Sequence, residues 1–124
     1  MAAPNIVGVT TILGVTTSIT LTTASQTILS NPANSGKVFK VNVINAANTT
    51  GSTASVTVRY AQGAAGAGTT VSIANGIDIT AKSSLVILDK ASTIYLEEAR
   101  SLTALSSANS AVDLVISYED ITNL

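Results

Sequence analysis

Two pairs of adjacent carboxylates, Glu97-Glu98 and Glu119-Asp120, come closest in this sequence to a catalytic or metal-binding pattern. Glycosidases place two carboxylates on either side of the bond they cleave, and calcium loops repeat acidic ligands at alternate positions. Neighbouring residues on a strand point to opposite faces, so neither pair forms such an arrangement by itself. No Asp-x-Asp-x-Asp spacing occurs either. We therefore predict that both pairs are solvated strand ends rather than a catalytic or metal site.

Serine and threonine are abundant, but the sequence contains no His and no Cys. Their absence excludes His-based acid–base catalysis, Cys nucleophiles, disulfides and thiolate zinc sites. Lys82 and Lys90 could serve as the base for a hydroxyl nucleophile only inside a buried pocket. We therefore predict that the protein is not an enzyme and has no catalytic residues, no metal site and no cofactor.

Two glycine-containing segments have a superficial likeness to phosphate-binding loops. Ser35-Gly36-Lys37 lacks the rest of that motif, because Asn31 replaces the required first Gly and Val38 replaces the Ser or Thr that binds Mg²⁺. The segment Gly63–Gly68 has no basic residue and no following helix. We interpret the first segment as a turn that enters a strand and the second as a flexible loop.

Three tyrosines, Tyr60, Tyr95 and Tyr118, and the sequon Asn48-Thr49-Thr50 are the remaining candidates for binding or modification. A carbohydrate-binding surface would display an aromatic platform, whereas these tyrosines fall on predicted strands, where we expect them to face the core or cap an edge. We expect the sequon to be a chance match, because residues 1–4 lack the basic residues of a secretory signal.

Charged side chains are scarce in this chain of 124 residues. They make up 10% of the sequence, against about 25% in typical soluble domains. The net charge of -1 argues against nucleic acid and anionic membranes as partners, because both attract clustered Lys and Arg. The length fits a single domain. With so few charges, its surface must be covered by Ser, Thr and Asn or by other subunits.

Alternating apolar residues predict the strands that position these candidates. Around the only Phe, we expect Phe39, Val41 and Val43 to face a core, with Lys40 and Asn42 on the other side. We take this as the central strand. A short apolar run at 27–29 and a turn signal precede it, and further strands are predicted at 54–61, 71–73, 77–79, 85–88, 94–96, 101–106 and 111–119.

The turn signals between these runs predict how the strands connect. We expect 54–61 to pair with the central strand, Asn75-Gly76 to form a two-residue hairpin, and 85–88, apolar on both faces, to lie between layers. No window has a sustained helical period. The predicted fold is therefore all-β, a β-sandwich or jelly roll.

Residues 1–36 contain no charged side chain. We predict two Thr-rich strands here, near Asn5–Ile12 and Val15–Thr23, around a turn at Gly14. Edge strands usually carry charges that prevent pairing with other chains, so we describe residues 1–36 as an uncharged N-terminal arm before a β-sandwich domain at residues 37–124. We expect part of residues 2–23 to pack on another subunit or a capsid shell. Pro4, which has no backbone N–H, can mark the point where this pairing begins. The alternative is that both strands complete the sandwich internally.

Four segments resemble small virion structural proteins of tailed bacteriophages, especially those of cyanobacterial and marine hosts. These segments, at residues 1–7, 35–41, 94–98 and 115–121, have the sequences MAAPNIV, SGKVFKV, IYLEE and VISYEDI. The resemblance spans most of the chain. Related sequences often have a Gly and an acidic residue after the Leu-Glu-x run, where this chain has Ala99 and Arg100, so the turn there is expected to differ.

This resemblance implies an all-β head or tail component without a catalytic role. A head decoration (cement) protein fits the size best: it would bind the outside of the capsid shell, often as a trimer. We therefore predict a homo-oligomer, with a trimer favoured, that contacts the major capsid protein at the head surface after assembly in the host cytoplasm. The alternatives are a tail, neck or fibre component, and a host-surface or carbohydrate-binding module, for which glycan binding at Tyr60 or Tyr95 would be diagnostic.

Overall fold

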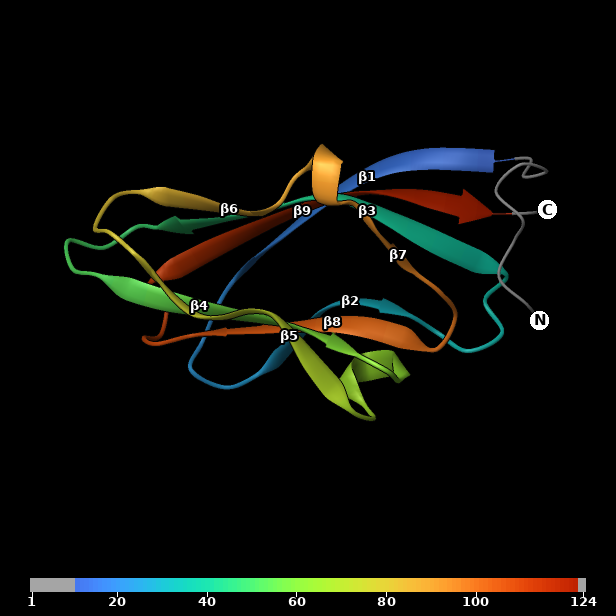
Figure 1. The fold of residues 1–124 in the computed structure, drawn as a ribbon, viewed down its shortest axis with the longest axis horizontal. Helices are drawn as coiled ribbons and strands as arrows, with labels where there is room; N and C mark the ends of the chain where they lie inside the picture. Colours follow the sequence, from blue (N-terminus) through green and yellow to red (C-terminus); the bar gives the residue numbers. More distant parts are fainter. Residues whose placement is uncertain (1–10, 123–124) are drawn as a thin grey trace.

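A computed structural model describes residues 11–122 and contains two packed layers of antiparallel strands (Figure 1). Within this range the only helical segments are two short 3₁₀ turns, η1 (Ala64–Gly66) and η2 (Lys90–Ser92). The strands are β1 (Thr11–Thr20), β2 (Gln26–Asn31), β3 (Lys37–Asn48), β4 (Ala54–Ala61), β5 (Thr70–Ile79), β6 (Ser84–Leu88), β7 (Ile94–Leu96), β8 (Arg100–Ser106) and β9 (Val112–Thr122).

The strand order is that of a jelly roll. One sheet, called sheet A, has the order β1-β9-β3-β6, and β7 also pairs with β3. The other, sheet B, has the order β2-β8-β4-β5. Because β6 and β7 pair with different parts of the same edge of β3, they act as one interrupted edge strand. Counted this way, each sheet has four strands, and the chain passes between the sheets as in a jelly roll. The predicted all-β sandwich is confirmed.

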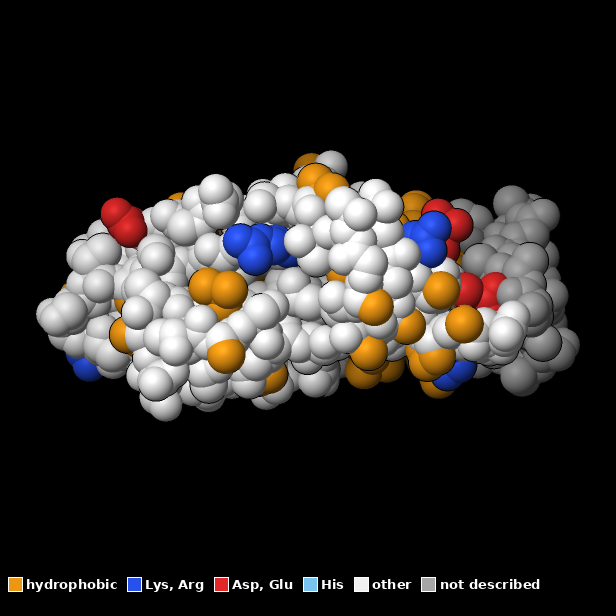
Figure 2. All heavy atoms as spheres, turned by 90° about the horizontal axis from the view of Figure 1, so that it is seen from below, with side chains coloured by type: hydrophobic (Ala, Val, Ile, Leu, Met, Phe, Trp, Pro, Cys, Tyr) orange, Lys and Arg blue, Asp and Glu red, His pale blue; other side chains and the backbone are white. Residues whose placement is uncertain are grey.

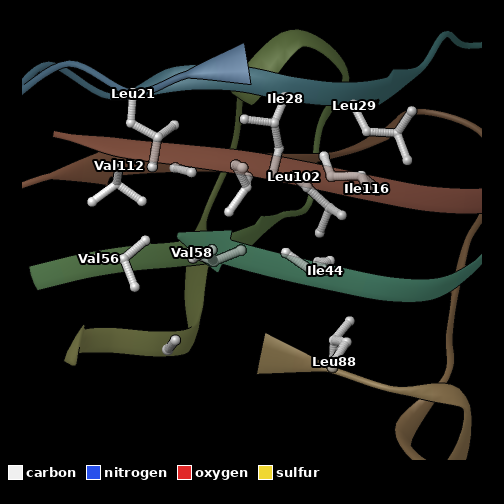
Figure 3. Packing of buried hydrophobic residues seen from close by; sticks show 14 of the residues in the cluster. Leu21, Ile28, Leu29, Ile44, Val56, Val58, Leu88, Leu102, Val112 and Ile116 are labelled. Atoms are coloured by element: carbon white, nitrogen blue, oxygen red, sulfur yellow. The ribbon is translucent and has the colours of Figure 1, made fainter. Parts of the chain in front are cut away.

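The core lies between the two sheets and is built mainly from aliphatic side chains. Figure 3 shows Ile44 and Ile116 of sheet A near Leu102 and Val58 of sheet B, and all four are fully buried. Phe39 is buried, as predicted, and its ring centroid lies 5.0 Å from that of Tyr118. Both sheets therefore depend on one continuous apolar interior.

β3 is a central strand of sheet A, between β9 and the β6/β7 edge, but one of its predicted faces is wrong. A β-bulge interrupts its pairing with β9: Val41 lies opposite Tyr118, whereas Val43 lies opposite Ser117. Asn42 is the extra residue, and it reverses the alternation beyond it. Ile44 and Ala46 therefore face the core in place of Val43.

Three predicted connections differ from the structure. β4 belongs to sheet B and does not pair with β3. Asn75-Gly76 lies inside the continuous strand β5 instead of forming a hairpin, and the positive φ of Gly76 serves a bulge. β6 is an edge strand, so Val86 is 57% exposed instead of being enclosed between layers.

The described part of the uncharged N-terminal segment belongs to the sandwich. β1 pairs with β9 along its whole length, from Thr11 to Thr20, without a register shift. Gly14 lies within β1, so the predicted turn there is wrong. β2 is an edge strand of sheet B, and Leu21, between β1 and β2, is fully buried. Most of the predicted strand at Asn5–Ile12, together with Pro4, lies outside the described residues.

Candidate functional site

The second predicted carboxylate pair is part of a polar cluster where β3 meets β9. Lys37 Nζ lies 3.1 Å from Asp120 Oδ2, and Lys40 Nζ lies 3.8 Å from Glu119 Oε2. The bulge residue Asn42 donates from Nδ2 to Glu119 Oε2 at 3.0 Å. The two carboxylates point to opposite faces, as predicted, but they are ion-paired rather than solvated, and the Asp120 side chain is only 14% exposed. These contacts link β3 to β9.

The two carboxylates of the first pair, Glu97-Glu98, have different surroundings. Glu97 is exposed, whereas Glu98 Oε2 accepts a hydrogen bond of 2.7 Å from the backbone N–H of Gly36. Gly36 has a positive φ of 71° and stands directly before β3. The segment Ser35-Gly36-Lys37 is thus the predicted turn into a strand, and Glu98 fastens it to the turn that precedes β8.

The remaining polar candidates also have structural contacts. Asn48 is 2% exposed, and its Nδ2 donates to the carbonyl oxygens of Ser52 and Ile79. The nitrogen that glycosylation would modify is therefore buried and already in use. Lys82 and Lys90 have exposed side chains, so neither lies in the buried pocket that a catalytic base would need.

No group of three or more acidic side chains that could hold a metal ion occurs among residues 11–122. Within the same range, no helix has the length and apolar character needed to cross a membrane. The surface that faces outward from sheet B is dominated by uncharged side chains, with few Lys, Arg, Asp or Glu (Figure 2).

The two sheets leave an apolar hollow of about 270 Å³ at one side of the sandwich. Its lining comes from Tyr60 on β4, Ile73 on β5, and Ile94 and Tyr95 on β7. Ile73 is the extra residue of a bulge in β5, between the pairs formed by Val58 and Arg59 of β4. Bulges often redirect a side chain near a functional site. Tyr95 is 44% exposed and Tyr60 is half-buried, so the hollow opens to solvent.

Tyr118 is placed differently from the other two tyrosines. It packs on Phe39 inside sheet A and does not line the hollow. Burial raises the pKa of its hydroxyl above the usual 10.0, the nearby Asp120 carboxylate raises it further, and Lys37 opposes both effects. The hydroxyl is therefore neutral over the physiological range, and Tyr118 has the core-facing role predicted for it.

The four outer edges of the sandwich are a second type of candidate site, and three of them are interrupted. β2 has only six residues and a register shift between Thr27 and Leu29. β5 has two register shifts against β4. The β6/β7 edge consists of five and three residues separated by η2, which carries Lys90. Short strands, bulges and charges are the usual means by which proteins prevent edges from pairing with other chains.

The fourth edge, β1, has none of these features. It is ten residues long, uncharged and regular, and no other strand of the described chain pairs with its outer edge. The register places Ile12 and Leu13 on opposite faces, and their exposed fractions are 55% and 56%. A Cβ on Gly14 would meet no atom of residues 11–122 within 4 Å. No contact within this range therefore requires Gly there, and a glycine within a strand often marks the close approach of another backbone.

Comparison with known proteins found no matching family model, no matching curated protein and no matching solved structure. The apolar hollow and the β1 edge are therefore the two features of this structure that bear on function. The sequence named Tyr60 and Tyr95 as candidates for binding but gave no sign that Ile73 and Ile94 join them. It also indicated that the N-terminal segment lacks charges, although only the structure distinguishes β1 from the other edges.

Proposed function

We propose that this chain is a non-enzymatic structural protein of a virion, and specifically a decoration protein that binds the outer surface of a bacteriophage capsid. In this role it holds neighbouring capsid subunits together through uncharged and apolar contacts with the major capsid protein and with its own copies. It acts without a cofactor and is assembled in the host cytoplasm.

The observation that carries this proposal is the uncharged edge strand β1, with Ile12 and Leu13 both more than half exposed. Soluble monomers usually protect such an edge. In a protein that functions inside a larger assembly, a neighbouring subunit covers such an edge. The jelly-roll strand order, which is common in capsid proteins, and the absence of His and Cys support the same role.

Cryo-electron microscopy of purified phage particles that encode this chain tests the proposal. We expect sandwich-shaped density on the outside of the head, with sheet A or its β1 edge against a neighbouring subunit. Density in the tail, neck or fibres would replace the decoration role by the alternative structural role. Mass spectrometry that finds no copies in purified particles would contradict both.

The tyrosine-lined hollow supports a second candidate, a host-surface or carbohydrate-binding module. Tyr95 presents an exposed aromatic side chain beside Tyr60, and sugars commonly stack on such rings. An array of bacterial surface oligosaccharides tests this function directly. Binding that is lost in Tyr95→Ala and retained in Val86→Ala, an exposed residue outside the hollow, would favour this candidate. No binding to any oligosaccharide on the array would contradict the carbohydrate-binding function.

A further inference from the structure

We infer that two copies of this chain join through their β1 strands, antiparallel and around a two-fold axis, so that their A sheets form one continuous sheet. The inference specifies how the proposed oligomer is made. It extends the proposed function but does not require it, because the contact belongs to the isolated protein.

The state of the four edges selects β1 as the partner of β1. A strand added to an exposed edge must itself offer unpaired backbone N–H and C=O groups over a regular stretch. Of the edges that the structure describes, β2, β5 and β6/β7 are short, bulged or interrupted. A second copy therefore has one suitable strand to offer, which is its own β1.

Charge also favours self-pairing. All residues of β1 are uncharged, so two copies approach without repulsion within the pair. A charged partner strand would gain no opposite charge from β1 and would lose water on pairing. Acidic side chains of β9 lie one strand away from the edge, where Asp113 is held by Thr20 Oγ1 at 2.7 Å. The edge is thus best matched by a strand as neutral as itself.

The pleat of the sheet restricts the register of this pair. Residues that lie opposite each other must point to the same face. The two-fold axis must therefore lie midway between the two copies of one residue, so that this residue is opposite itself. Placing Thr16 on the axis pairs residues 12–20 of both copies. It sets Leu13 beside the partner's Ile19 and Thr16 beside the partner's Thr16. Both combinations are favourable cross-strand pairs, and the first covers an exposed apolar side chain.

The expected dimer is weak in dilute solution. A pair of strands roughly 30 Å long buries less surface than the about 1,200 Å² of a standard stable interface. We therefore expect dissociation in the micromolar range or above. Copies held on a common shell would form the same contact far more readily, because their effective concentration is high.

A two-fold contact differs from the trimer that the family resemblance implies. A ring of three made through sheet edges would join β1 of one copy to a different edge of the next. The interruptions in the other three described edges disfavour that arrangement.

Sedimentation velocity of the full chain over a range of concentrations tests this inference. We expect the mean mass to rise from 12.5 kDa towards twice that value. Thr16→Lys should raise the dimer dissociation constant by roughly tenfold, because it places two like charges opposite each other at the centre of the pair. Ser72→Lys, the matched change at an exposed position of β5, should leave it unchanged. A monomer at all concentrations would overturn the inference, as would equal effects of the two variants.

An introduced cysteine provides a second readout that does not depend on how Thr16→Lys folds. The chain has no Cys, so Thr16→Cys creates one thiol per copy. Directly opposed residues have Cβ atoms about 4.5–5.5 Å apart, near the range that a disulfide spans. Oxidation should give a disulfide-linked dimer with Thr16→Cys and not with Ser72→Cys. Failure to cross-link would refute the proposed register.

These results are distinguishable from failure of the proposed function. A chain that is monomeric in solution but present on phage heads would refute β1 pairing alone. A β1-linked dimer that is absent from particles would refute the virion role alone.

Discussion

β1 and β5 are edge strands of equal length on opposite sheets, yet their edges differ. Each has ten residues. β1 keeps one register against β9 from end to end, whereas β5 loses register twice against β4. Strands of equal length therefore differ in regularity, and the irregularity of β5 arises from a few residues. In the proposed assembly this regularity distinguishes the β1 edge from the β5 edge.

One of the β5 bulges has an identifiable cause. Gly76 has a φ of +60°, and its backbone N–H donates to Thr57 Oγ1 on β4 at 3.0 Å. The extra residue lies between the pairs formed by Val56 and Val58. A glycine in a left-handed conformation and a hydroxyl across the strand therefore divert this edge. β1 also contains a glycine, Gly14, but it has no positive φ and causes no shift.

The largest expected effect is on stability, and it tests whether the sheets that carry β1 and β5 share one core. Phe39→Ala should lower the free energy of unfolding by about 3–5 kcal/mol, because it removes a large buried side chain from between the sheets. Urea unfolding followed by circular dichroism measures this loss. A midpoint close to that of the native protein would mean that Phe39 does not support the shared core as described.

An intermediate effect compares the two glycines directly. Gly76→Ala should cost about 1–2 kcal/mol, because alanine is strained at positive φ. Gly14→Ala should instead stabilise the monomer by about 0.4–1 kcal/mol, because the site is open and the unfolded chain loses freedom. Urea unfolding at low protein concentration gives both values. The same sign for both substitutions would contradict the contrast between the strands.

The smallest effect concerns pH and the core side of β1. Tyr118 lies opposite Val15 in the β1–β9 register, and its pKa is raised above 10.0, chiefly by burial. The folded state therefore keeps this proton when the unfolded state has lost it, so stability is full below pH 10 and declines as pH rises through the folded pKa. Tyr118→Phe should make the alkaline decline shallower. An unchanged decline would indicate that Tyr118 is not buried beside β1.

The sequence predicted where the strands lie better than how they pair with one another. Period-two alternation located β7 at Ile94–Leu96 and most of β9, because both depend on local pattern alone. The hairpin predicted at Asn75-Gly76 is wrong because a Gly with positive φ suits a bulge as well as a hairpin turn, and the choice depends on the partner strand. The reversal of faces at Asn42 also depends on the partner strand, because the bulge is defined by pairing with β9.

The candidate sites were predictable only in part. The lack of charge in β1 is visible in the sequence. What distinguishes β1 from the other edges is visible only in the structure, which shows which strands form edges and where bulges occur. The hollow joins Tyr60 and Ile73 to residues of β7 through contact between the sheets. No local pattern predicts such a meeting, because it depends on how the two sheets are layered.

Hydrogen exchange at two protein concentrations tests the central claim, that β1 and not β5 is the edge used for assembly. In a monomer, both strands have amides that point away from the sheet and exchange rapidly. At high concentration, peptides that cover Thr11–Thr20 should become protected, while those that cover Thr70–Ile79 should exchange as before. Protection confined to β5, or no concentration dependence in β1 while the protein associates, would contradict the claim.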